Sequence, residues 1–116
     1  MHEISLVRNM FRALEETFGE AERSRIRAIR LKIGQLSNVE PLLMHNAFDA
    51  VVATDAPEYQ QARLEIETVP IRIRCAACGG ESAVEQYRFV CAHCGKPSSD
   101  LIAGTELLIS GVELDE

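Results

Sequence analysis

The sequence predicts an α+β fold, in which two helices lie on a three-stranded antiparallel sheet and a small four-cysteine zinc-ribbon module is inserted. Two segments repeat apolar residues at the spacing of a helix, and two others alternate apolar and charged residues as strands do. All four cysteines of the chain lie within residues 75–94. In a chain of 116 residues, this pattern fits one small two-layer unit with an insert.

The first half of the chain predicts a helix, a strand and a second helix. Residues 4–18 form the first helix, because their apolar residues fall on one face, and Gly19 ends it. Residues 25–33 form a strand, since apolar and basic side chains alternate there. The second helix begins at Pro41, which suits the first helical position, and ends before Pro57.

The second half of the chain predicts the remaining strands. Residues 62–69 alternate apolar and charged side chains and form a strand that Pro70 ends. A short strand at residues 87–89 leads into the second cysteine pair, and residues 105–113 form the last strand.

The position of the last strand determines the predicted domains. An isolated strand at the end of the chain could not bury its side chains, so we expect it to join the first sheet. The predicted organisation is therefore an α+β domain of residues 1–69, completed by residues 102–116, with an inserted metal-binding module at residues 70–101.

The two cysteine pairs predict a structural zinc site. Cys75 and Cys78 form one C-x-x-C pair, and Cys91 and Cys94 form the other. Each C-x-x-C turn brings two thiolates to one side of a loop, and four thiolates complete the tetrahedron of a closed zinc site. Two disulfides would need an oxidising compartment, and a thioredoxin-like redox motif uses a single C-x-x-C.

Glycines and histidines near these pairs have simpler interpretations. Gly79, Gly80 and Gly95 follow the pairs, where we expect backbone angles that glycine tolerates without a Cβ penalty. We expect His93 to be a solvated side chain, because four cysteines already fill the metal shell. His45 lies in the second helix without another ligand three or four residues away, so we expect a surface or boundary histidine.

The composition argues against several classes of function. The net charge is −6, whereas nucleic-acid affinity comes largely from Lys and Arg. No apolar run approaches the roughly 20 residues of a membrane helix. The start Met1-His2-Glu3-Ile4 lacks the features of a secretory signal, and four reduced thiols fit the cytoplasm. We therefore expect a cytoplasmic protein that binds neither nucleic acid nor membrane.

The N-terminus offers a second set of metal donors. The amine of Met1, the imidazole of His2 and the backbone nitrogens of His2 and Glu3 can enclose one metal in fused chelate rings. Nitrogen donors close to one plane select Ni(II) or Cu(II). The alternative is an exposed and idle histidine, since a lone histidine is a weak motif. No nucleophile–base pattern or phosphate loop is visible in the sequence, so we do not expect an enzyme.

Several stretches, in order and nearly from end to end, resemble the HypA/HybF family of hydrogenase nickel-incorporation proteins. They are residues 1–6 (MHEISL), residues 33–37 (IGQLS) with 39–41 (VEP), the paired C-x-x-C motifs, and residues 104–107 (GTEL). The paired motifs alone are shared with many zinc ribbons. Their combination with an N-terminal Met-His-Glu is much more specific.

The resemblance implies a nickel metallochaperone that helps to build [NiFe]-hydrogenase and, in some bacteria, urease. It implies Ni(II) at Met1, His2 and Glu3 and structural Zn(II) at the four cysteines. Some members use a carboxylate at the position of Glu40 as a further nickel ligand. The implied partners are a HypB-type GTPase and the hydrogenase large-subunit precursor, and we expect a monomer or a homodimer. The alternative is a zinc-ribbon nucleic-acid-binding or scaffolding module without a nickel role.

Overall fold

The structure, a computed structural model, describes residues 3–115. The chain divides into two compact units, each assembled from segments that are distant in sequence. Unit 1 comprises the described residues of Met1–Leu31, Val39–Glu67 and Ile109–Glu116, and unit 2 comprises Lys32–Asn38 and Thr68–Leu108.

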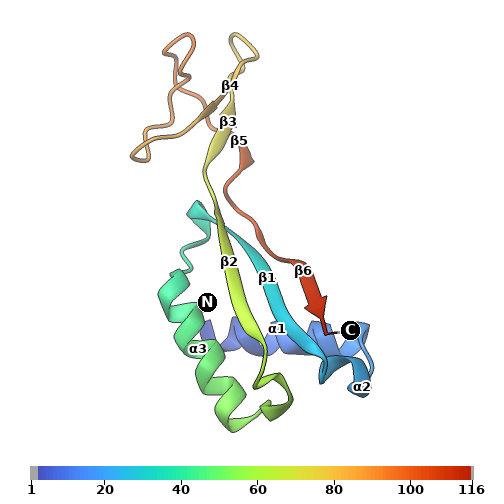
Figure 1. Cartoon of the computed structure of the whole chain (residues 1–116). Coiled ribbons are helices and arrows are strands. Elements are labelled where there is room, and N and C mark those ends of the chain that lie inside the picture. The colour runs from blue at the N-terminus through green and yellow to red at the C-terminus, as the bar shows by residue number, and fades with distance from the viewer. Residues whose placement is uncertain (1–2, 116) are drawn as a thin grey trace. The chain divides into compact units, whose positions relative to one another are not determined.

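Unit 1 holds most of the α+β body that the sequence predicts (Figure 1). Its helices are α1 (Glu3–Thr17), α2 (Glu20–Arg23), α3 (Pro41–Thr54) and the 3-10 turn η2 (Pro57–Tyr59). Its strands come from β1 (Ile26–Gly34), β2 (Arg63–Val69) and β6 (Leu107–Leu114). The α+β class is confirmed, and the predicted bounds of these strands agree to within two residues. None of the described helices is both long and apolar enough to cross a membrane.

The core of unit 1 forms where α1 and α3 pack together. The residues that α1 buries recur at helical spacing: Leu6, Val7, Met10, Phe11 and Leu14. The Phe11 ring stacks on Tyr59 of η2, with centroids 4.3 Å apart and planes inclined by 15°. It also lies 5.7 Å from the ring of Phe48 in α3. This aromatic cluster joins both long helices to the turn that precedes β2.

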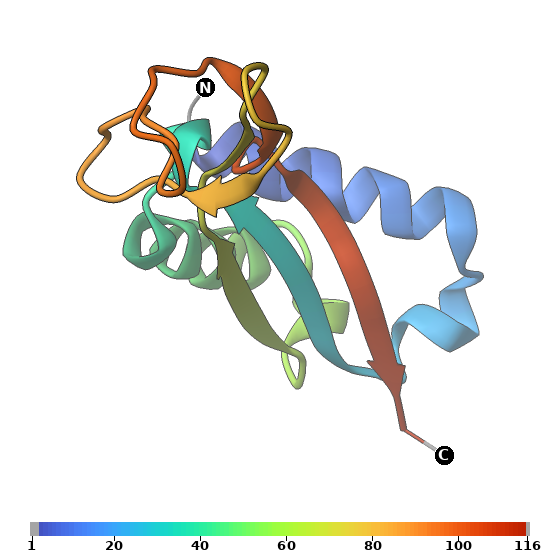
Figure 2. The same ribbon diagram turned by 90° about the horizontal axis from the view of Figure 1, so that it is seen from above.

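The sheet of unit 1 is mixed rather than fully antiparallel. The strands lie side by side in the order β2-β1-β6 (Figure 2). β1 and β6 are antiparallel, because Asp115 N–H donates to Arg25 O at 2.7 Å while the Ser110 hydroxyl donates to Arg30 O at 3.3 Å. In Figure 1 the chain follows β1 and β2 in the same direction. The helical connection through α3 explains this difference from the expected antiparallel sheet, since a crossover helix lets neighbouring strands run parallel.

The exposed arginines on this sheet are paired with carboxylates. Arg30 Nε lies 2.9 Å from Glu65 and its Nη2 lies 2.8 Å from Glu113. Arg63 Nε lies 2.7 Å from Glu65, and this hydrogen bond is the main cause that lowers the pKa of the Glu65 carboxyl. The alternating arginines thus belong to a solvated, charge-balanced strand face.

Unit 2 contains a second three-stranded sheet. β3 (Arg72–Arg74) pairs antiparallel with β4 (Glu81–Ala83) on one side and β5 (Asp100–Ala103) on the other. Its apolar cluster is small: Ile71, Ile73 and Val84 are buried, with Leu36 and Phe89 packed against them. These three strands were not predicted from the sequence, because each has only three or four residues.

The strand predicted at residues 87–89 is wrong. In the described chain, Glu85 and Arg88 form an isolated bridge instead. Gln86 and Tyr87 between them have φ values of 54° and 59°, so both occupy the left-handed region and form a tight turn. Neither residue is a Gly or Asn, which normally indicate this type of turn, and the alternation of apolar and basic residues was therefore misleading.

Candidate metal centre

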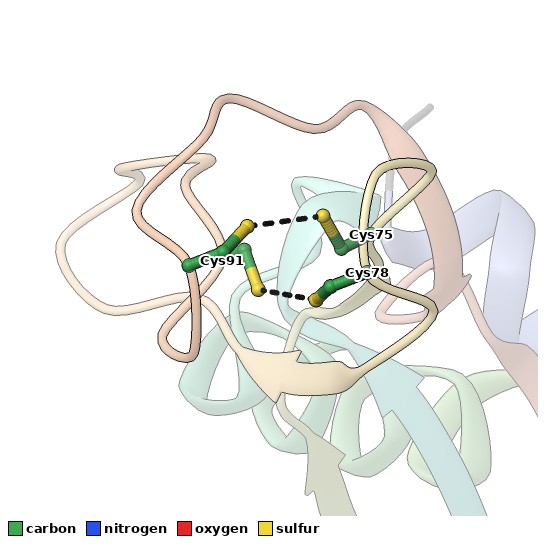
Figure 3. A group of neighbouring side chains, drawn as sticks. Cys75, Cys78 and Cys91 are labelled. Atoms are coloured by element: carbon green, nitrogen blue, oxygen red, sulfur yellow. Dashed lines mark hydrogen bonds between the residues drawn. The ribbon is translucent and has the colours of Figure 1, made fainter.

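The structure brings the four predicted cysteines together in unit 2. Their Sγ atoms all lie within 4.8 Å of one another. The Sγ atoms of Cys75 and Cys94 are 3.5 Å apart, and those of Cys78 and Cys91 are 3.6 Å apart (Figure 3). Across residues 3–115, no other group of three or more His, Cys, Asp or Glu side chains is placed to hold a metal ion.

The same tight turn positions both cysteine pairs. Gly79 N–H donates to Cys75 O at 2.8 Å, and Gly95 N–H donates to Cys91 O at 2.9 Å. Both glycines have a φ of +75°, as expected from the sequence. Each turn directs its two sulfurs towards the other pair, so the two backbone turns bring four soft ligands together.

The two cysteines within a pair differ in their electrostatics. Backbone N–H groups three and two residues further along the chain lower the pKa of Cys75 to about 6 and also lower the pKa of Cys91. For Cys78, the Gly80 N–H is the largest influence and lowers the pKa. Contact with the other thiols and burial together outweigh it and raise the pKa to about 11. The pKa of Cys94 is raised in the same way.

The donor set fits Zn²⁺ in a closed tetrahedral site. Zn–S bonds of about 2.3 Å require neighbouring sulfurs about 3.8 Å apart, which is close to the spacing across the two pairs. Cys75 and Cys91 are buried, whereas Cys78 and Cys94 are exposed, and all four are free thiols. Four protein ligands leave no open position for a substrate, so the chemistry of such a centre is structural.

Gly80 and His93, beside the cysteines, contact each other in a way that the sequence did not indicate. Gly80 does not have a positive φ, unlike Gly79 and Gly95. A Cβ on Gly80 would instead lie 2.7 Å from Cδ2 of His93. His93 is exposed as predicted, but its Nε2 lies 3.1 Å from the carbonyl oxygen of Glu81. Sequence reasoning missed this contact, since no local pattern connects the two residues.

Of the three residues predicted to bind nickel, the structure describes only Glu3. Met1 and His2 are outside the described residues. Glu3 is the first residue of α1 and is half-buried. Glu40 is exposed at the N-cap of α3 without a side-chain capping bond, and His45 is half-buried within that helix. The N-terminal chelate therefore stays a prediction.

Two segments that carry the family resemblance meet within unit 2. Gly34 N–H donates to Glu106 O at 2.7 Å, and Leu36 N–H donates to Gly104 O at 2.8 Å. A Cβ on Gly34 would lie only 2.1 Å from Gly104 O, so the two segments approach each other too closely for any side chain at Gly34. These motif residues have a structural role, which their sequence spacing did not indicate.

The fold and the site define a small α+β protein with a four-thiolate metal centre. A family model described as "Hydrogenase/urease nickel incorporation, metallochaperone, hypA" matches residues 1–114. The chain belongs to the HypA family, as the resemblance of its motifs predicted.

Individual relatives agree over the whole length. The chain is 36% identical over 116 residues to the hydrogenase maturation factor HypA of Desulfitobacterium hafniense (strain DSM 10664 / DCB-2), covering 100% of both chains. It is 35% identical over 113 residues to that of Moorella thermoacetica, covering 97% of this chain and 98% of the relative. The solution structure of the Ni metallochaperone HypA from Helicobacter pylori shares the fold, with a TM-score of 0.65 and 22% identity over 98% of this chain and 97% of that one.

Proposed function

We propose that this chain is a nickel metallochaperone that binds Ni(II) at its N-terminus and delivers it during the maturation of [NiFe]-hydrogenase, with urease as a second candidate recipient. The observation that carries the proposal is the extent of the family match. It runs over residues 1–114 and so includes both Met1-His2-Glu3 and the four cysteines. Relatives of the same length are named hydrogenase maturation factors.

The chemistry of the two donor sets supports separate sites for two metals. Four thiolates suit tetrahedral Zn(II), whereas an amine, an imidazole and backbone nitrogens suit Ni(II) in a plane. We assign Zn(II) to the cysteines as a structural ion and Ni(II) to Met1, His2 and Glu3 as cargo. The nickel donors must be deprotonated to bind, so protonation or a competing partner ligand releases the ion.

The proposed partners follow from the delivery role. They are a HypB-type GTPase and the precursor of the hydrogenase large subunit, met by this chain as a monomer or a homodimer in the cytoplasm. Four cysteines that bind zinc as thiolates fit a reducing compartment. The net charge of −6 and the ion-paired arginines of the sheet argue against a nucleic-acid partner.

A calorimetric titration of Ni(II) into zinc-loaded protein tests this proposal. The protein must carry its own N-terminus without a tag. We expect one nickel per chain, lost in His2→Ala and in a variant with one extra residue before Met1, and kept in His45→Ala as the matched control. Unchanged binding in the first two variants would move the site away from the N-terminus. Zinc binding without nickel binding would favour the scaffolding or nucleic-acid alternative.

A transfer assay tests the delivery step. Nickel-loaded chain is mixed with the GTPase and the metal-free large-subunit precursor, and nickel in the re-isolated precursor is measured. We expect transfer from the wild type and none from His2→Ala, with the same zinc content in both. Equal transfer from both proteins would contradict the proposal.

A further inference from the structure

The second cysteine pair is held on strand β4 by residues that are not metal ligands. Ala92 N–H, within that pair, donates to Ser82 Oγ at 3.3 Å. The ring of His93 places its Nε2 3.1 Å from the carbonyl oxygen of Glu81. β4 pairs with β3, and the first cysteine pair lies in the connection between these two strands. The two contacts therefore connect one half of the metal centre to the other.

The atoms involved define the chemistry of each contact. A backbone carbonyl can only accept a hydrogen bond, so Nε2 of His93 carries the proton and donates it. Ser82 is only 6% exposed, and its hydroxyl accepts the Ala92 N–H. A buried hydroxyl is costly unless it is hydrogen-bonded, so the second pair satisfies a group that β4 would otherwise leave unpaired.

Space for the His93 ring depends on Gly80. A Cβ at this position would lie 2.7 Å from His93 Cδ2 and 3.4 Å from Cys78 Sγ. Because the φ of Gly80 is not positive, the backbone does not require a glycine here. Glycine is required at this position because the His93 ring occupies the space that the Cβ of any other residue would need.

We propose that Gly80, Ser82 and His93 form a clamp that keeps the second cysteine pair closed on the metal, with His93 and Ser82 as positioning residues. The inference rests on the proposed zinc site at the four cysteines and is independent of nickel. Zinc leaves such a centre when one pair moves away and a competing ligand enters. Hydrogen bonds that join the pairs oppose this movement. Outer-shell partners of this kind typically change metal affinity by about 10–100-fold.

Zinc release from the full chain into excess 4-(2-pyridylazo)resorcinol, followed by absorbance, tests the clamp. We expect His93→Ala and Ser82→Ala each to release zinc about tenfold faster than the wild type. His93→Gln should restore slow release, since the Gln amide nitrogen can donate from a position close to Nε2. Gly80→Ala should release faster, because its methyl group displaces the ring. His45→Ala, which changes a histidine of unit 1, is the control.

The spectrum of bound Co(II) separates a positioning role from a folding defect. Every variant keeps four cysteines, so we expect one tetrahedral, thiolate-bound Co(II) per chain in each. Release from His93→Ala at the wild-type rate would overturn the clamp, as would equally fast release from His93→Ala and His93→Gln. A wild type without stoichiometric zinc would instead overturn the zinc assignment, and the clamp with it.

Discussion

The two units of this chain differ in the size of their apolar cores. Unit 1 has an extensive apolar core, in which the rings of Phe11, Phe48 and Tyr59 cluster and the helices bury whole faces. Unit 2 has only three buried apolar residues in its cluster besides two buried cysteines. Apolar cores of this size rarely order a module of about 50 residues without a disulfide or a metal. We therefore expect hydrophobic burial to support unit 1 and the proposed zinc site to support unit 2.

Removal of the metal should have the largest effect and should act on unit 2. Structural zinc provides about 10–16 kcal/mol of apparent binding free energy, and removal of one thiolate opens the closed four-ligand site. We expect Cys75→Ser to abolish zinc retention and to remove hydrogen-exchange protection from residues 68–108, while the buried face of α1 stays protected. Ala76→Ser, an exposed position in the same turn, is the control. Loss of protection in α1 to the same extent would contradict two separate sources of stability.

The complementary change removes the centre of the aromatic cluster in unit 1. Phe11 is 5% exposed, and truncation of such a ring costs about 3–5 kcal/mol. We expect Phe11→Ala to lower the free energy of unfolding of unit 1 by this amount in urea denaturation, with one zinc per chain retained. Ile4→Ala, on the same helix but 47% exposed, should change it by less than about 0.5 kcal/mol. Loss of zinc from Phe11→Ala would argue that the units fold as one.

The proton balance of the thiols makes zinc affinity depend on pH. In the zinc-free chain, the pKa of Cys75 is about 6, so it is a thiolate at neutral pH, and the pKa of Cys91 is lowered as well. Cys78, with a pKa of about 11, and Cys94, whose pKa is raised, still hold protons. Zinc should therefore displace two or three protons at neutral pH, depending on Cys91, and its affinity should fall by at least about a hundredfold per pH unit on acidification.

Calorimetry in two buffers with different enthalpies of ionisation counts these protons. A count near zero or near four would contradict the asymmetry between the first and second cysteine of each pair. The Cys75 thiolate also stabilises the zinc-free fold. Because its folded pKa lies below the ordinary value of 9.0, this stabilisation is complete above that pH and is lost as the pH falls towards 6.

The close approach of two motif segments in unit 2 predicts a moderate effect. A methyl group at Gly34 would overlap the carbonyl of Gly104, and overpacking of this kind costs about 1–3 kcal/mol. We expect Gly34→Ala to lower the thermal midpoint of the zinc-loaded chain. Gly111→Ala is a matched control, because a Cβ there meets nothing within 4 Å. Equal thermal midpoints for the two variants would show that the Gly104 segment can move to accommodate the methyl group without loss of stability.

The smallest effect concerns a buried hydroxyl in unit 1. Tyr59 Oη is buried without a hydrogen-bond partner among the described residues, and burial raises the pKa of Tyr59 to about 12. Tyr59→Phe keeps the ring stacked on Phe11 and removes the unpaired group. We expect the free energy of unfolding to stay the same or to rise by up to about 1 kcal/mol. A clear decrease in the free energy of unfolding, measured by chemical denaturation, would show that the hydroxyl has a hydrogen-bond partner.

The same contrast explains what could be predicted from the sequence. Periodicity located α1, α3, β1 and β2, because the burial of one face in a long element leaves a local pattern. The spacing of the cysteines predicted their cluster, since each C-x-x-C turn is also local. The strands β3 to β5 are too short for a pattern, and the turn at Gln86 and Tyr87 lacks glycine. The contacts of His93 and Ser82 depend on tertiary structure and could not be read from either stretch alone.

X-ray absorption at the zinc and nickel edges of one sample tests the central claim most directly. Untagged chain loaded with one equivalent of each metal should show zinc surrounded by four sulfurs at about 2.3 Å. Nickel in the same sample should show nitrogen and oxygen neighbours without sulfur. This result would mean that the thiolates of unit 2 and the N-terminus of unit 1 sort the two metals by ligand chemistry. Sulfur around nickel, or fewer than four sulfurs around zinc, would contradict the account.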